Sequence, residues 1–269
     1  MTTALHAPEY LVDLAAYPIL DLDGDRARAV ISTARDSLRR TGAAELPGFV
    51  TREALYALKA DAESLEHLAH RSGGTGTAYL AAPDGDLPAG HPRRYTGRYA
   101  VGAVAYDLFP TWSPLRRMYE CAALLAFIEA VLDRGPLFRY ADPCGALNLA
   151  VMGDGDELQW HYDMTDFVVS LAIRDAERGG DFEVAPMIRS AEDERYDDVA
   201  RVLSGDRSQV VTLPMTPGTL LLFEGRNSLH RVTPVVGSVT RLVGLLAYDT
   251  KPGTVSSARL RMDRYGRDS

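Results

Sequence analysis

The sequence has few cysteines and no long apolar run. Only two of its 269 residues are cysteine, and they form neither a CxxC pair nor a Cys/His cluster. This excludes a disulfide scaffold and a cysteine-based zinc site. We expect Cys121, which lies in an apolar helical stretch, to be a buried free thiol. The longest apolar run, CAALLAFIEAVL, is too short for a bilayer and contains Glu129, so we expect no membrane span.

Basic and secretory segments are also missing. No long block of Lys and Arg occurs, and the formal net charge is −8. We therefore expect no nucleic-acid partner, and we interpret the acidity as a contribution to solubility. The N-terminal stretch MTTALHAPEYLVDL has no basic region followed by an apolar run, so it does not predict a secretion signal. These features predict a soluble, reduced, cytoplasmic protein.

The chain divides into a helical first half and a β-rich second half. We expect residues 1–136 to form a helical region that packs on a core of residues 137–269, as one compact unit. Cap and stop signals predict helices over Asp23–Arg40, Arg52–Arg71 and Ser113–Asp133, and AAELPGFV predicts a short strand. The Gly- and Pro-rich stretch from Gly73 to Tyr106 allows no assignment.

Short β-rich runs separated by turn residues follow one another from residue 137 onward. They are ALNLAVM, LQWHYD, DFVVSLAI, DFEVAP, SQVVTLPM, GTLLLFEG, HRVTPVV and TRLVGLLAYD. This spacing is typical of an all-β sandwich or barrel. The polar insertion SAEDERYDDVARVLSG predicts a short surface helix. The expected fold class is therefore mainly β with helices (α+β).

The run LQWHYDMTDFVVSLAI places a histidine and a carboxylate at the start of an apolar strand. Because side chains alternate along a strand, His161 and Asp163 point to one side, while Trp160 and Tyr162 point to the other. A second histidine, His230 in FEGRNSLHRVTP, lies on a strand that returns to the same region. Two imidazoles and one carboxylate form the facial triad of non-haem Fe(II) sites and leave three positions open. We interpret the nearby Asp166 as a loop or capping residue.

An arginine in SVTRLVGLLAY extends this pattern. If Gly237-Ser238 is a two-residue hairpin loop, Arg241 pairs with Pro234 and faces the same side as His230. Four residues of strand separate the two side chains by roughly 13 Å. The planar guanidinium suits the carboxylate of an acid whose other end chelates the metal.

The HxD triplet, the distal histidine and an arginine eleven residues later resemble the Fe(II)/2-oxoglutarate-dependent dioxygenases. The resemblance covers roughly Leu137 to Thr250 and implies a double-stranded β-helix, a cupin-like jelly-roll. The segments FRYADPCGALNLAVMGDGDELQWHYDMTDFVVSLAIRDAERGGDFEVAP and GTLLLFEGRNSLHRVTPV are similar to the carrier-free amino-acid halogenases and their hydroxylase relatives. Halogenating members have glycine at the carboxylate position, so Asp163 implies a hydroxylase.

The resemblance also implies roles for individual residues. His161, Asp163 and His230 would bind Fe(II) and form the catalytic centre. Arg241 would hold the distal carboxylate of 2-oxoglutarate. Arg98, in RRYTGR, corresponds to an arginine that contacts the substrate carboxylate, although a solvated basic patch is an equal alternative.

Two further positions qualify the resemblance. Asn148 either contacts 2-oxoglutarate or is a satisfied core amide. Lysine-specific members carry a histidine three residues before the first iron ligand, whereas this chain has Leu158, which disfavours lysine as the substrate. The implied reaction is hydroxylation of an unactivated C–H bond in a small molecule, a free amino acid or derivative, with consumption of dioxygen and release of succinate and CO2. Desaturation, cyclisation and a non-catalytic jelly-roll that senses a small acid are the alternatives.

Overall fold

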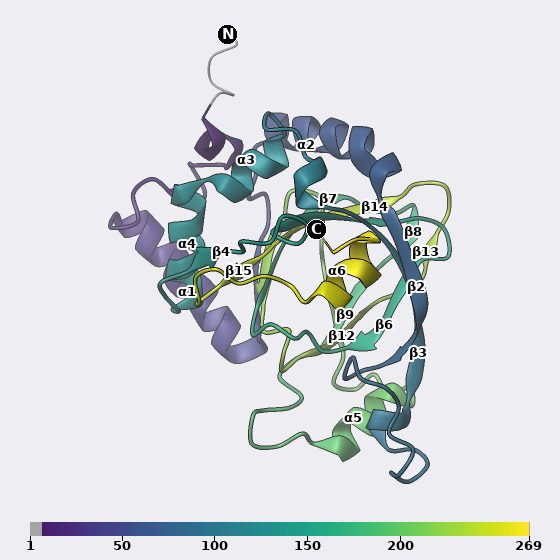
Figure 1. The fold of residues 1–269 in the computed structure, drawn as a ribbon. Coiled ribbons are helices and arrows are strands. Elements are labelled where there is room, and N and C mark those ends of the chain that lie inside the picture. Colours follow the sequence, from purple (N-terminus) through teal and green to yellow (C-terminus); the bar gives the residue numbers. More distant parts are fainter. Residues whose placement is uncertain (1–6, 269) are drawn as a thin grey trace.

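One curled antiparallel sheet forms the centre of the structure. The computed structural model describes residues 7–268, so residues 1–6, part of the stretch without a predicted secretion signal, lie outside the described residues. Ten strands follow the order β1-β11-β7-β14-β5-β3-β6-β12-β9-β10, and an eleventh, β2, pairs with β3 beside this path. The sheet curls around an interior, as Figure 1 shows. Within residues 7–268, no helix is both long and apolar enough to cross a membrane.

The strands are short, and most lie after residue 137. Two ribbons, β13 with β8 and β15 with β4, stand outside the main sheet. The bounds are β1 Ala43–Leu46, β2 His70–Thr77, β3 Thr96–Val104, β4 Phe138–Arg139, β5 Leu147–Met152, β6 Glu157–His161, β7 Val168–Arg174, β8 Arg178–Gly179, β9 Phe182–Ala185, β10 Val211–Leu213, β11 Leu220–Phe223, β12 Leu229–Val232, β13 Val235–Val236, β14 Arg241–Leu246 and β15 Tyr248–Asp249.

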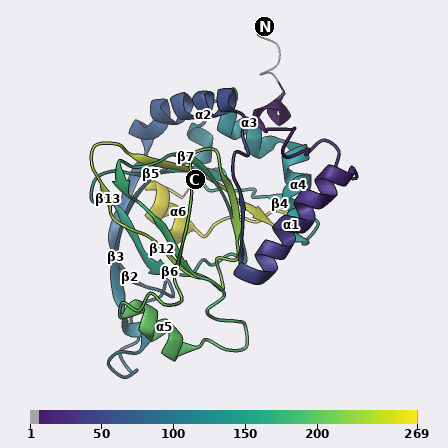
Figure 2. The ribbon, with the colours of Figure 1, turned by 180° about the vertical axis from the view of Figure 1, so that it is seen from behind.

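Most helices lie on one side of the sheet. Figure 2 shows α1, α3 and α4 together on that side, while α6 lies within the curve of the sheet and α5 lies beyond another edge. The bounds are η2 Pro8–Leu11, α1 Asp25–Thr41, α2 Arg52–Leu65, η3 Glu66–Leu68, η4 Pro92–Arg94, η5 Tyr106–Leu108, α3 Pro114–Glu120, α4 Ala122–Leu132, α5 Tyr196–Leu203 and α6 Ala258–Tyr265.

Alternation along the strands builds two separate cores. On β5, Leu147 and Leu149 pack into the large core beneath α1–α4. Ala150 and Met152 belong instead to an inner cluster that includes Phe182 and other side chains from the facing strands. We call this second cluster the inner core. A strand buried on both faces explains why the runs in the second half are almost continuously apolar.

The predicted fold class is confirmed, with corrections to two helices. The helix predicted over Arg52–Arg71 ends at Leu65, and β2 begins at His70, because this polar segment pairs along its whole length with β3. The third helix breaks at Cys121 into α3 and α4, since the backbone of Cys121 is extended. The sheet also takes β1, β2 and β3 from the first 136 residues. The division at residue 136 stays a prediction.

The predicted hairpin at Gly237-Ser238 is wrong. The strand before it, β13, pairs with β8, and the strand after it, β14, pairs with β5 and β7. Gly237 has φ +110° and donates its N–H to Oδ1 of Asp154 at 2.9 Å, so the loop is fixed by another segment of the chain. Arg241 therefore lies opposite Met152 rather than Pro234.

Candidate metal centre

Neighbouring strands bring the three predicted metal ligands together. His161 at the end of β6 is the register partner of His230 on β12, and their ring centroids lie 4.2 Å apart. Asp163 follows two residues after His161, and the ligand atoms of all three residues lie within 4.8 Å of one another. Two histidines that face each other on paired strands, and an aspartate two residues after the first, thus place three ligand atoms around one possible metal position.

Backbone carbonyls orient both imidazoles. Nδ1 of His161 lies 2.7 Å from the carbonyl oxygen of Gln159, and Nδ1 of His230 lies 2.9 Å from that of Ser228. Each Nδ1 therefore carries the proton and donates it, which leaves the Nε2 lone pair for a metal. Such hydrogen bonds fix the tautomer and ring orientation of metal-binding histidines.

The carboxylate of Asp163 has an oxygen without a hydrogen-bond partner. Oδ2 is buried, and it accepts no hydrogen bond from any residue in 7–268. It lies 3.4 Å from Nε2 of His230, while Oδ1 lies 4.0 Å from Nε2 of His161. A buried carboxylate oxygen without a partner is costly unless a cation compensates its charge. The residues therefore fit a bound metal ion.

The surroundings of the triad keep His161 neutral. Burial, and after it the neighbouring His230, lower the pKa of His161 to about 4 against the opposing effect of Asp163. Phe182 and Phe223 pack against the His230 ring at centroid distances of 5.6 and 4.8 Å. A neutral imidazole is the form that binds a metal, because its lone pair is free.

Sequence reasoning missed one residue that shapes this centre. Gly225 accepts a hydrogen bond from the N–H of Asp163 at 3.0 Å, and a β-carbon at position 225 would overlap Oδ2. The sequence shows a glycine five residues before His230, which could have drawn attention to this position. It does not show that the Asp163 side chain lies against that glycine.

Arg241, on β14, lies opposite Met152 of the inner core. It is only 7% exposed, and its Nη1 lies 3.9 Å from the sulfur of Met152. Burial lowers the pKa of the guanidinium to about 10, and the charges of Asp175 and Asp181 raise it in part. The group is therefore a buried cation at neutral pH, without a direct carboxylate partner in 7–268.

Asn148 also faces the interior, because its strand neighbours Leu147 and Leu149 point the other way, into the large core beneath α1–α4. Its side chain forms a hydrogen bond with Tyr265 of α6. Oδ1 is buried and has no partner among the described residues. The amide is thus only partly satisfied, which leaves one polar atom for a ligand.

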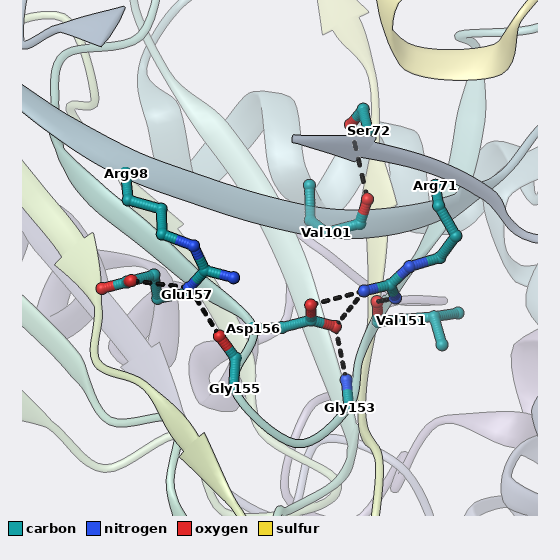
Figure 3. A network of polar contacts seen from close by, with 9 residues as sticks. All are labelled: Arg71, Ser72, Arg98, Val101, Val151, Gly153, Gly155, Asp156 and Glu157. Atoms are coloured by element: carbon teal, nitrogen blue, oxygen red, sulfur yellow. Dashed lines mark hydrogen bonds and ion pairs between the residues drawn. The ribbon is translucent and has the colours of Figure 1, made fainter. Parts of the chain in front are cut away.

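Among the described residues, Arg98 forms no hydrogen bond or ion pair with the predicted metal ligands, Arg241 or Asn148. Figure 3 shows its guanidinium donating to Glu157 and to the carbonyl oxygen of Gly155, at 2.8 and 2.7 Å. Its side chain is 56% exposed. The neighbouring Arg71 bonds similarly to Asp156. The structure does not bring Arg98 into contact with the triad, and its substrate role stays a prediction.

The residues that alternate with the triad have packing roles. Trp160 and Tyr162 lie in a separate cluster with Val199 and Val202 of α5. The guanidinium of Arg189 covers the Tyr162 ring at 3.7 Å. Asp166 accepts a hydrogen bond from Arg226, so it is tied to the surface loop and not to the metal position.

Residues 103–262 match the sequence model of a family described as Halogenase D. The chain belongs to the Halogenase D family. The matched span includes the triad and Arg241. The predicted family is thereby confirmed, together with the enzyme class and its cofactors, iron(II) and 2-oxoglutarate. No curated protein matches the chain in sequence.

Solved structures confirm the jelly-roll fold of this Halogenase D family member. AviO1 from Streptomyces viridochromogenes Tue57 is 20% identical with a TM-score of 0.57, covering 84% of this chain and 97% of that chain. The alpha-ketoglutarate-dependent carbocyclase SnoK is 15% identical (TM-score 0.56), covering 80% and 82%. A 2OG-Fe(II) oxygenase family oxidoreductase from Burkholderia pseudomallei is 16% identical (TM-score 0.52), covering 83% and 92%. At these identities the likeness concerns the fold alone.

Proposed function

We propose that this oxygenase hydroxylates an unactivated C–H bond of a small molecule, a free amino acid or amino-acid derivative. His161, Asp163 and His230 would hold iron(II), and Arg241 would hold the distal carboxylate of 2-oxoglutarate. The observation that carries the proposal is the buried Oδ2 of Asp163, which has no partner in 7–268 and lies beside two correctly oriented imidazoles.

The residues of the chain would bind and orient the reactants. When bound, iron and 2-oxoglutarate supply the oxidation, in which dioxygen and 2-oxoglutarate give succinate, CO2 and one oxygen atom for the substrate. Arg241 compensates a carboxylate in a site from which the inner core excludes water, where a charge-assisted pair is strong. Asn148 offers a polar atom of its amide to the same ligand.

Asp163 favours hydroxylation over halogenation. In the halogenating proteins that this sequence resembles, glycine at this position leaves room for chloride on the metal. Here the carboxylate occupies that room, and its Oδ2 lies 3.4 Å from Nε2 of His230. The chain matches a family described as Halogenase D, while its own carboxylate favours oxygen transfer.

Two alternatives share most of these observations. Desaturation or cyclisation uses the same ligands, so the metal centre does not distinguish them from hydroxylation. A non-catalytic sensor of a small acid would keep the fold and Arg241, but it would have no need for three metal ligands. The hydroxylase is favoured over the sensor because the whole ligand set is present.

A panel assay tests the proposal. The protein is incubated with Fe(II), 2-oxoglutarate, air and each of the twenty free amino acids, and succinate and product masses are measured. We expect one amino acid to stimulate succinate release and to gain one oxygen atom. His161→Ala should abolish both, whereas His67→Ala, at an exposed histidine, should change neither. A loss of two hydrogens would assign desaturation or cyclisation, and binding without succinate would favour the sensor.

A further inference from the structure

A single loop contacts two of the three predicted metal ligands. Residues 224–228 join β11 to β12, and we call them the ligand loop. The carbonyl oxygen of Gly225 accepts a hydrogen bond from the backbone N–H of Asp163 at 3.0 Å. The carbonyl oxygen of Ser228 lies 2.9 Å from Nδ1 of His230. The loop also closes on itself, since the N–H of Ser228 donates to the carbonyl oxygen of Glu224 at 3.0 Å. The two carbonyls that hold the ligands are therefore parts of one turn.

The ligand loop is anchored at its first residue to the layer of helices. The N–H of Glu224 donates to the carbonyl oxygen of Gly42, the C-cap of α1, at 2.7 Å. Both carboxylate oxygens of Glu224 accept hydrogen bonds from Nη2 of Arg134, which follows α4, at 2.8 and 3.0 Å. The two side chains are 14% and 35% exposed. A charge-assisted pair with so little access to water holds its geometry better than a pair on the open surface.

The guanidinium of Arg134 is itself held in place. The preceding residue, Asp133, forms an ion pair with Arg35 of α1 at 3.1 Å. The guanidinium carbon of Arg134 also lies 6.0 Å from the ring centroid of Phe167, which is buried in the large core beneath the helices. The helical layer and the core thus give Glu224 a fixed partner.

A second arginine ties the ligand loop from its outer side. Arg226 donates to the carboxylate of Asp166 and to the carbonyl oxygen of Met164, both in the segment that follows Asp163. The side chains of Arg226 and Asp166 are more than half exposed, so water competes with this pair. The more buried pair at Glu224 is therefore the stronger hold on the loop.

We propose that Arg134 and Glu224 are positioning residues for the metal ligands. This inference rests on the proposed function. Their ion pair fixes the start of the ligand loop and thereby the two carbonyls that hold Asp163 and His230. A shift of the loop would stretch the hydrogen bond to Asp163 or press Gly225 against Oδ2, where there is no room even for a β-carbon. Supporting groups of this kind typically change metal affinity 10- to 100-fold when they are removed.

The test is a titration of the full-length, metal-free protein without oxygen. Fe(II) binding is measured by calorimetry, and Co(II) is added as a probe whose visible absorption reports the geometry of its ligands. The parent is compared with Glu224→Gln, Arg134→Gln, Arg134→Lys and the double glutamine variant. Glu63→Gln is the matched control, because Glu63 pairs α2 with Arg174 of β7, away from the ligand loop. His161→Ala tests the metal centre itself, and thermal unfolding shows whether each variant is folded.

We expect Glu224→Gln and Arg134→Gln each to weaken Fe(II) binding about 10- to 100-fold and to change the Co(II) spectrum. The double variant should bind no more weakly than the weaker single variant, because all three lose the same pair. Arg134→Lys keeps the charge and should recover part of the affinity. If a glutamine variant does not fold, Arg134→Lys carries the test, and parent-like affinity there would overturn the inference. Glu63→Gln should bind Fe(II) as the parent does.

The direction of the two single effects separates positioning from a long-range effect of charge. If charge alone mattered, loss of the negative Glu224 would weaken Fe(II) binding, and loss of the positive Arg134 would strengthen it. Such opposite changes would overturn the inference, as would an unchanged affinity and Co(II) spectrum in both variants, or an equal loss in Glu63→Gln. If the parent binds no Fe(II), or if His161→Ala binds it as tightly as the parent, the metal centre of the proposed function itself fails.

Discussion

Gly225 lies so close to Asp163 that a β-carbon at position 225 would overlap the carboxylate oxygen Oδ2. The same glycine accepts a hydrogen bond from the N–H of Asp163, so its backbone and the proposed ligand hold each other in place. The absence of a side chain at position 225 is therefore part of the proposed metal centre.

Replacing Gly225 with alanine should displace the carboxylate and weaken iron binding. We expect the affinity for Fe(II) to fall about tenfold or more, because supporting residues around a metal site typically have effects of 10- to 100-fold. Titration of Fe(II) without oxygen measures the effect. Gly85→Ala is the control, since nothing lies within 4 Å of a β-carbon there. Equal iron affinity in both variants would show that Asp163 does not bind the metal.

The sequence could predict where the strands lie, but it could not predict how they pair. Apolar runs between turn residues are sufficient to predict strands, as they do for β5, β6 and β14, and a sandwich or barrel. The jelly-roll was implied by the family resemblance. They do not specify which strand pairs with which. Gly237-Ser238 has the length of a tight hairpin, yet β14 pairs with β5 and β7. Partners distant in the sequence decided this pairing.

The metal centre followed a local pattern, whereas the placement of α6 did not. His161 and Asp163 are two residues apart, so alternation alone places them on one side. Helix α6 lies about a hundred residues further along the chain and has no clear apolar period. Ser257 as a cap and Gly266 as a stop could have predicted that helix. Its packing against the interior depends on Tyr265 and is not visible in the sequence.

Arg241→Ala should raise the 2-oxoglutarate requirement and leave iron binding nearly intact. Removing one partner of a buried charge pair costs about 2–5 kcal/mol, which corresponds to an affinity loss of roughly 30-fold or more. Calorimetric titration with 2-oxoglutarate measures this loss. Arg178→Ala removes an exposed arginine of the nearby ribbon and should have no effect. An unchanged 2-oxoglutarate affinity in Arg241→Ala would mean that another residue holds the carboxylate.

The metal-free protein should lose stability in mild acid through His161. Its folded pKa of about 4 lies below the ordinary value of 6.5, so from pH 6.5 down to 4 the unfolded chain takes up a proton that the folded protein does not. Stability therefore falls with falling pH, by about 2 kcal/mol between pH 7.5 and 5. Urea unfolding with a chelator present measures the change. His161→Gln should reduce this pH dependence, and identical curves for parent and variant would contradict the shift.

Replacing Asp163 with glycine and adding chloride tests the role of the carboxylate in the reaction. The resemblance to the halogenases indicates that an open metal position is necessary for chloride to bind. It need not be sufficient, because the position of the substrate decides whether its carbon receives chlorine or oxygen. We therefore expect loss of most hydroxylation, with at most a trace of chlorinated product by mass spectrometry. Asp163→Glu should also fail, since the added methylene displaces the carboxylate against Gly225.

The decisive comparison is the activity of Asp163→Gly without chloride. Two imidazoles alone should bind iron more weakly and leave it without a compensating negative charge. If this variant hydroxylates as fast as the parent, Asp163 is not an iron ligand. The unpartnered Oδ2 would then need another cation, which a metal analysis of the purified parent protein and of Asp163→Gly would identify.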